Sequence, residues 1–331
     1  MTYTLTNLGP HQHYSYDPRF EGTTIYSVQD RATGGAFDTH AAYWDGQWTI
    51  LPDPDDGLRR AVAEDGITDV VVGHIALNAP QLYQRAMIWT YSTGLWTPTA
   101  LPLPTGALSS SAVAVSADGT KIAGEVDFGF YNIAAALWTE SGGVWSVAVL
   151  PKPDLRAYTV GFDDATGDVI GNIVEFSNWH AVRWHYDGSD WTIVRFAFPG
   201  LVPPPPTEVT TTAQGHANGY TVGWSSVSGA PTQAVRWRPD GTIEDLGAGD
   251  HSMAYGTNGD VVVGTIKPGV FDNGFVWTAT DGVVDIHPAG QDWSLPSGVD
   301  MNGRIVGTMG TGKPNAATGD RDFFLLTPSG P

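Results

Sequence analysis

The chain has 331 residues, of which 41% are apolar, enough to bury a sizeable core. Its 35 acidic residues against 16 Lys and Arg give a formal net charge of −19, which repels nucleic-acid phosphates and anionic membrane surfaces. The absence of cysteine excludes disulfides, thiolate metal sites and a cysteine nucleophile. We therefore expect a globular protein with neither a nucleic-acid nor a membrane partner.

The N-terminal residues, MTYTLTNLGP, contain neither the basic segment nor the apolar run of a signal peptide. No apolar run in the chain approaches the 18 residues that a membrane span needs. The sequence therefore predicts a cytoplasmic protein, or a secreted one if a leader has been removed, and we expect a monomer or a weak oligomer.

An aromatic motif recurs along the chain, as in AVRW at residues 181–184 and again at residues 234–237. Its anchoring residues lie 40 to 53 positions apart, a spacing typical of propeller blades. The anchors are Trp44, Trp89, Trp138, Trp184, Trp237, Trp277 and, less closely matched, Leu325.

A second motif, V-x-G, lies 13 to 18 residues before each anchor, and Ser27 replaces its glycine in the first repeat. The stretch before it often ends in Asp-Gly or Asn-Gly, which is typical of a type I′ hairpin turn. A fourth stretch, often W-T-x-x-x-L-P, follows the anchor. Each repeat therefore predicts four short antiparallel strands, named a to d here. The V-x-G glycines are Gly73, Gly124, Gly171, Gly223, Gly264 and Gly307.

Six repeats are complete, whereas the seventh ends after strand c. Residues 2–9 have the pattern of strand d in the fifth repeat, so we expect them to complete the last blade. The sequence predicts an all-β fold, with residues 1–331 forming a single seven-bladed β-propeller of four-stranded antiparallel blades. The N-terminal strand would close its ring and remove an open sheet edge.

These motifs resemble the HAF-repeat family of bacterial propeller-like proteins. The resemblance is carried by YTLTNLG at residues 3–9, AVSADGTKIAGE at residues 114–125, and the AVRW and ALWT forms of strand c. It implies the propeller architecture over nearly the whole chain. The family is often expected outside the cell and provides no single shared activity to assign here.

Polar and bulky residues gather where strand a begins, a position that lies near one mouth of the channel in propellers. Histidine titrates near neutrality and arginine can hold an anion, so this set predicts acid–base chemistry on a small molecule. The expected reaction is of the lyase, isomerase or cyclase type, with no cofactor and no metal, although His11 and His13 could together bind a divalent metal. The catalytic candidates are His11, His13, Tyr14, Tyr16, Arg59, Arg60, Arg156, Tyr158, Glu208 and His251.

Substrate-binding candidates come from strand a, from the position after the V-x-G glycine, and from the loops between strands b and c. Aromatic rims suit sugar rings or apolar ligands. The candidates are Trp293, His74, Glu125, Phe128, Phe130, Tyr131, Trp179 and Trp224. Other loop aromatics are expected to cap blade ends, among them Phe37, Tyr83, Phe176 and Phe271.

A second function is open at this point, namely a non-catalytic module that binds a glycan or a protein. The loop residues differ from repeat to repeat, which favours one composite site over seven equal ones. The arginines of the two AVRW motifs, Arg183 and Arg236, are expected to belong to the scaffold, with carboxylate partners across a blade interface.

Overall fold

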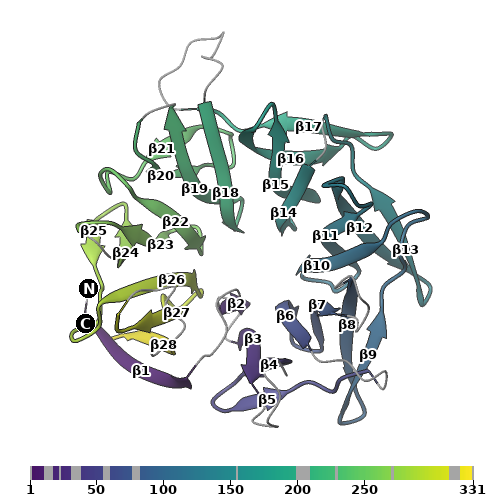
Figure 1. Ribbon diagram of the computed structural model, residues 1–331, viewed down its shortest axis with the longest axis horizontal. Helices are drawn as coiled ribbons and strands as arrows, with labels where there is room; N and C mark the ends of the chain where they lie inside the picture. The colour runs from purple at the N-terminus through teal and green to yellow at the C-terminus, as the bar shows by residue number, and fades with distance from the viewer. Residues whose placement is uncertain are drawn as a thin grey trace. The chain divides into compact units, whose positions relative to one another are not determined.

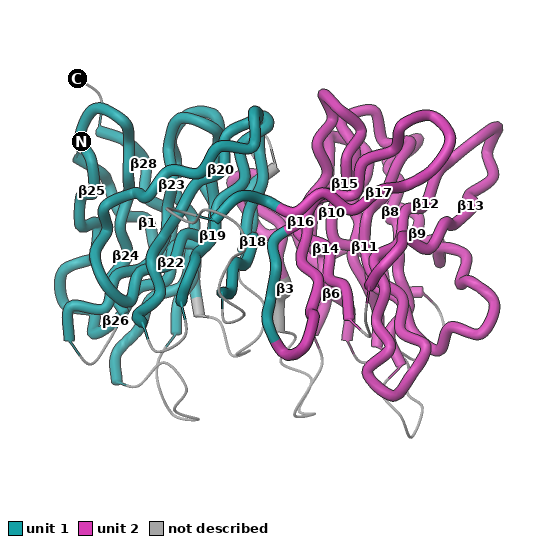
Figure 2. The backbone as a smooth tube through the Cα atoms, turned by 90° about the horizontal axis from the view of Figure 1, so that it is seen from above, with its two compact units in different colours: residues 1–23, 178–181, 196–331 teal, residues 24–177, 182–195 magenta. Residues whose placement is uncertain are grey.

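The computed structural model describes residues 2–10, 18–21, 24–30, 39–54, 60–76, 83–153, 156–198, 209–227, 230–269, 272–312 and 321–329. They belong to two compact units, coloured separately in Figure 2. Unit 1 comprises residues 1–23, 178–181 and 196–331, and unit 2 comprises residues 24–177 and 182–195. These described residues contain no helix long and apolar enough to cross a membrane.

Unit 2 carries the first four sequence repeats, whose strands pair antiparallel within each repeat. Their strands are β3 (Thr24–Asp30), β4 (Thr39–Trp44) and β5 (Trp48–Ile50); β6 (Arg60–Ile67), β7 (Val70–Ala76), β8 (Gln84–Ser92) and β9 (Leu95–Ala100); β10 (Ser109–Val115), β11 (Lys121–Asp127), β12 (Ile133–Ser141) and β13 (Val144–Val149); and β14 (Arg156–Asp163), β15 (Asp168–Glu175), β16 (Asn178–Tyr186) and β17 (Trp191–Arg195). The first four residues of β16 fall in unit 1. Single parallel bridges, Thr39 with Arg60 and Ile133 with Arg156, join the first repeat to the second and the third to the fourth.

Unit 1 carries the remaining repeats and the N-terminal strand. Its strands are β18 (Val209–Ala217), β19 (Tyr220–Val227), β20 (Gln233–Trp237) and β21 (Ile243–Asp245); β22 (Met253–Thr257), β23 (Val261–Ile266), β24 (Asn273–Thr278) and β25 (Gly282–Asp285); β26 (Trp293–Val299), β27 (Ile305–Gly310) and β28 (Arg321–Pro328); and β1 (Tyr3–Pro10) with β2 (Arg19–Glu21). Figure 1 shows β1, in purple, alongside β28, in yellow, and the two pair antiparallel from Tyr3 opposite Pro328.

Strand a of six repeats contains a β-bulge, and the V-x-G glycine of strand b lies opposite it. In the third repeat the bulge falls between Ala112 and Ala114, and Gly124 pairs with Ala112. The bulge turns the carbonyl of the preceding residue onto the glycine, so that a Cβ there would lie only 1.8–2.3 Å from that oxygen in all six repeats. Only glycine fits this close backbone approach, which explains the V-x-G motif.

The aromatic anchors join neighbouring repeats through a hydrogen bond from the indole to the backbone. Trp138 Nε1 donates to the carbonyl of Pro102, at the end of the preceding repeat, over 2.8 Å. The same bond recurs from Trp89 to Pro52, from Trp184 to Pro151 and from Trp237 to Ala197, over 2.7–2.9 Å. All four indoles are fully buried, so each combines a large apolar contact with a satisfied N–H.

Buried hydroxyl groups in strand a, or directly before it at Ser252, form a second set of hydrogen bonds between repeats. Ser110 Oγ accepts the amide of Ala86 over 3.0 Å, and Ser252 Oγ accepts the amide of Ala234 over 2.9 Å. Thr211 and Ser294 form the same bond with the amides of Ala181 and Gly274. This bond satisfies a backbone donor where strand c begins, which is why small hydroxyl residues occupy the position.

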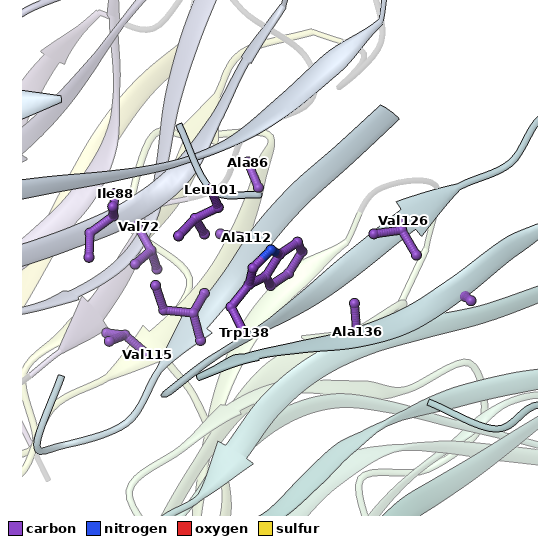
Figure 3. Close-up of a cluster of buried hydrophobic side chains, with 11 residues drawn as sticks. Val72, Ala86, Ile88, Leu101, Ala112, Val115, Val126, Ala136 and Trp138 are labelled. Carbon is purple, nitrogen blue, oxygen red and sulfur yellow. The ribbon is translucent and has the colours of Figure 1, made fainter. Parts of the chain in front are cut away.

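The core lies between consecutive repeats. Figure 3 shows Trp138 packed among residues of the second and third repeats, including Ala86, Leu101 and Ala112. Equivalent clusters lie between the first and second, third and fourth, fifth and sixth, and sixth and seventh repeats. Each sheet is therefore stabilised mainly by its neighbour.

The structure changes two details of the sequence pattern. The strand-c anchors pair with the residue two before the V-x-G glycine, as Trp138 does with Ile122, and in the last repeat Leu326 takes that place, not Leu325. A shift of one residue moves the side chain to the other face of the strand. The type I′ expectation fits Asn218 and Gly219, which both have positive φ, but it is wrong for the third repeat, where φ is positive at Gly119 and not at Asp118.

Candidate functional site

Six of the sequence-predicted catalytic residues lie outside the described residues, and their placement stays a prediction. They are His11, His13, Tyr14, Tyr16, Arg59 and Glu208. Within the described ranges, no group of three or more His, Asp and Glu side chains could hold a metal ion.

His74 and Trp293, two of the predicted substrate-binding residues, are packed inside the repeats. His74 is 5% exposed, with its Nδ1 3.7 Å from Glu64 Oε1, and burial lowers its pKa although Glu64 acts in the opposite direction. Trp293 is 1% exposed, and the Arg321 guanidinium lies 5.3 Å from its ring centroid. Both side chains are therefore almost fully covered by the surrounding protein.

Four other predicted residues lie within the described ranges. Arg60 begins β6, where it pairs with Thr39, and is half-buried. Trp179 in β16 and Trp224 in β19 are also half-buried, while His251 is an exposed turn residue with a φ of 60°. Arg60 belongs to unit 2, whereas Trp179, Trp224 and His251 belong to unit 1.

Four predicted residues of unit 2 do come together, where β11 ends and β14 begins. The Arg156 guanidinium lies over the ring of Tyr131, 4.4 Å from its centroid. Tyr158, two residues along β14, shares a hydrogen bond with Arg156 and lies within the electrostatic influence of Glu125 and Asp127. Glu125 Oε1 accepts the amide of Thr159 over 3.1 Å, which fixes its carboxylate beside this cluster.

The Tyr158 hydroxyl is held in its neutral form. Burial raises its pKa, the positive charge of Arg156 opposes that rise, and the carboxylates of Glu125 and Asp127 add to it. Because the phenol remains protonated at neutral pH, it can both donate and accept a hydrogen bond.

The loop between β11 and β12 divides its three aromatic residues between core and solvent. Phe128 packs against the core shared by the second and third repeats. Phe130 and Tyr131 are 98% and 70% exposed, with φ angles of 52° and 64°. The conformation is fixed by hydrogen bonds from Gly129 N to Asp127 Oδ1 and from Asn132 N to Gly129 O, over 2.7 and 2.9 Å.

A similar exposed aromatic lies in the next repeat, at the turn between β15 and β16. Phe176 is 93% exposed with a φ of 48°, and Ser177 follows with a φ of 76°. The expectation that Phe176 caps a blade end is therefore wrong. Because Val174 pairs with Arg156, Phe176 lies two residues, or roughly 7 Å, beyond the strand pair that holds Arg156.

We name this region of unit 2 the aromatic loop surface and define it by Phe130, Tyr131, Arg156, Tyr158 and Phe176. The sequence identified four of these residues as candidates. It missed Asp127, although a carboxylate two residues before a glycine, in a D-x-G loop, is a signal for the bond that Asp127 makes.

The arginines of the repeated AVRW motif belong to the scaffold, but their carboxylate partners lie in the same repeat rather than across an interface. Arg236 bonds Glu244 of its own sheet through Nη2 over 2.7 Å, and reaches the next repeat only at the carbonyl of Gly259 and the ring of Trp277. Arg183 lies 3.9 Å from Asp168, also in its own sheet.

Comparison with known proteins gives a fold but no family. No protein-family model and no curated protein sequence matches the chain. An acylaminoacyl peptidase solved with Z-Gly-Gly-Phe-chloromethyl ketone is similar at a TM-score of 0.61 and 11% identity, covering 96% of this chain and 52% of that one. The Pyrococcus horikoshii acylaminoacyl peptidase is similar at 0.58 and 12%, covering 93% and 49%. The β-propeller domain of the Trilobed protease from Pyrococcus furiosus is also similar, at 0.46 and 9%, covering 82% and 96%.

The two likenesses with TM-scores above 0.5, together with the antiparallel sheets, establish an all-β, propeller-type fold. The chain spans about half the length of the two peptidases, so their activity does not transfer to it. They also contradict the expected lyase, isomerase or cyclase, because the structures that this chain is similar to are propeller regions of peptidases. The alternative, a propeller module, fits this finding better.

Proposed function

We propose that this chain is a non-catalytic binding module whose ligand contacts the aromatic loop surface. The observation that supports it is the pair of nearly fully exposed phenylalanines, Phe130 and Phe176, in neighbouring repeats. Solvated aromatic side chains of this size gain free energy when a ligand covers them, about 1.5–3 kcal/mol each on full burial. Arg156 and Tyr158 between them provide the polar contacts that give a ligand its orientation.

The backbone at these aromatics supports a binding role. Left-handed φ angles at bulky residues cost of order 1–3 kcal/mol each, and such strain is often found at ligand-contacting positions. Phe130, Tyr131 and Phe176 all carry this cost while burying little of their own surface. Folding alone does not explain why these three positions hold aromatics.

The proposal includes the architecture of the whole chain, as a single seven-bladed propeller of the HAF-repeat type. The seven repeats of the sequence support it, together with the pairing of β1 with β28 in the last of them. The differences among the loops favour one ligand per chain. That ligand is a small molecule, a glycan or a protein, and the chain itself is a monomer or a weak oligomer.

The experiment is a binding measurement on the whole chain with two sets of probes, hexasaccharides and twelve-residue peptides. The test variant is Phe130→Ala with Phe176→Ala. Its matched control is Leu95→Ala with Val144→Ala, which removes two apolar side chains that are 70% and 68% exposed at other hairpin turns. We expect one site per chain, a loss of at least ten-fold in the test variant, and no change in the control.

Three outcomes would overturn the proposal. They are the absence of binding by every probe, binding that the test variant retains, and conversion of a probe to a product by the wild-type chain. A stoichiometry of five to seven would replace the single site with repeated ones.

A further inference from the structure

The charged groups described around the aromatic loop surface balance one another. The described basic groups there are Arg156, Lys152 and Arg195, and the acidic groups are Glu125, Asp127 and Glu175. Arg195 pairs with Glu175, and Lys152 Nζ donates to the carbonyl of Ile133 over 3.1 Å. In a chain of net charge −19, the described charges at this surface are equal in number, three of each sign.

A cationic ligand would have to compete with a cation already in place. The Arg156 guanidinium lies 4.4 Å from the centroid of the Tyr131 ring, where an ammonium group would otherwise bind. An anionic ligand would meet Glu125 and Asp127 beside Arg156, as well as the negative field of the whole chain. Both classes of charged ligand are therefore disfavoured.

The polar groups offer both donors and acceptors within a short span. Arg156 can only donate hydrogen bonds, the carboxylates of Glu125 and Asp127 can only accept them, and the neutral Tyr158 hydroxyl can do either. A ligand that suits this mixture needs many small groups that both donate and accept. Hydroxyl groups have that property.

The exposed aromatics complete the description. Phe130, Tyr131 and Phe176 offer flat apolar faces and have few rotatable bonds, so a ligand orders them at low entropic cost. A pyranose ring has an apolar face of C–H groups and a rim of hydroxyls, and thus matches both the aromatic and the polar parts of the surface.

We infer that the aromatic loop surface binds an uncharged oligosaccharide. This inference rests on the proposed binding function and names the ligand class of the same site. The pyranose faces stack on Phe130 and Phe176, and the hydroxyls bond Arg156, Tyr158 and the neighbouring carboxylates.

The experiment is isothermal titration of the whole chain with hexasaccharides that differ in charge. The uncharged probes are cellohexaose, xylohexaose, mannohexaose and laminarihexaose. The acidic probe is hexagalacturonic acid, and the basic probe is the glucosamine hexamer. We expect at least one uncharged probe to bind at least ten-fold more tightly than the acidic one, with an affinity that changes less than two-fold between 20 and 300 mM NaCl. Salt screens charge–charge attraction, so binding of the basic probe to the acidic chain should fall over the same range.

Two variants place the site. Arg156→Met should weaken binding of the uncharged probe at least ten-fold without changing the unfolding midpoint by more than a degree or two. Phe176→Asn with Ser177→Gly installs residues that favour left-handed φ, so it should raise the midpoint while it abolishes binding. A residue with a purely structural role would lower the unfolding midpoint and the saccharide affinity together.

The results separate this inference from the function on which it rests. Binding of an uncharged peptide with no saccharide binding would overturn the saccharide inference and leave the binding module in place. Tight, salt-dependent binding of only the acidic or basic hexamer would also overturn it. Failure of every saccharide and peptide would overturn both.

Discussion

Gly124 shows why the position opposite the bulge in strand a accepts only glycine. A Cβ added at Gly124 would lie 2.1 Å from the carbonyl oxygen of Ser111, and 3.0 Å both from Ala112 Cα and from the Trp138 ring. Ordinary contacts begin near 3.4 Å, so the Gly124→Ala variant requires the Ser111 carbonyl to withdraw by more than an ångström. That carbonyl belongs to a hydrogen-bonded bulge and cannot rotate away as a side chain could.

The expected cost follows from this geometry. Overpacking in a core typically costs 1–3 kcal/mol when side chains can adjust. Because backbone must move here, we expect Gly124→Ala to lower the free energy of unfolding by about 3 kcal/mol or more. Urea denaturation followed by tryptophan fluorescence measures the change.

Gly269→Ala is the matched control, because a Cβ there meets nothing within 4 Å and φ is not left-handed. It should leave stability within about 0.5 kcal/mol or raise it slightly, since alanine has less freedom in the unfolded chain. If Gly124→Ala cost less than about 1 kcal/mol, or no more than the control, the close carbonyl would not be the reason why the V-x-G position requires glycine.

The remaining predictions concern three buried groups. Trp138→Phe removes the hydrogen-bond donor to the Pro102 carbonyl and replaces the indole with a smaller ring. We therefore expect the free energy of unfolding, measured by urea denaturation, to fall by about 2–4 kcal/mol. A fall below about 1 kcal/mol would contradict the role of this hydrogen bond. The pKa of His74 lies below 6.5 in the folded protein, so the unfolded chain binds a proton first and stability should fall as pH drops below about 6.5. His74→Gln should flatten that fall, and an unchanged slope would refute the role of His74. Arg236→Met should cost about 2–4 kcal/mol, because it removes a buried cation from its carboxylate partner, Glu244. Arg183→Met should cost less than about 1 kcal/mol, because Arg183 is 34% exposed, lies 3.9 Å from Asp168, and leaves that buried carboxylate with its closer partner His185. Equal losses would contradict this difference.

The sequence predicted the repeats well because the residues that define them act locally. A glycine opposite a bulge recurs at a fixed position in six repeats, and a tryptophan that reaches the preceding carbonyl recurs in four, so both appear as periodic letters. The seventh anchor failed for the opposite reason. Leu325 and Leu326 are both leucine, and only the ladder, which pairs Ile305 with Leu326, decides which of them faces inward.

The candidate surface was less accessible to sequence reasoning. Arg156 and Tyr131 are 25 residues apart in the chain and meet only because neighbouring repeats pack together. The left-handed conformation of Phe130 and Phe176 runs against the preference of bulky residues, so no propensity predicts it. The predicted lyase, isomerase or cyclase is contradicted by the similarity to peptidase structures. Its candidate residues share a position in the repeat, and a shared position does not by itself determine a reaction.

The bond from four of the anchoring indoles to the preceding repeat has a consequence for how such chains diversify. Its acceptor is a backbone carbonyl, a group that every amino acid possesses, and Ala197 already replaces the proline found at the other three acceptor positions. A repeat can therefore be duplicated, exchanged or inserted without a matching substitution in its neighbour. Recombination of repeats is then limited mainly by how well the apolar side chains between neighbouring repeats fit. The loops can diverge in sequence while the hydrogen bonds between repeats stay the same.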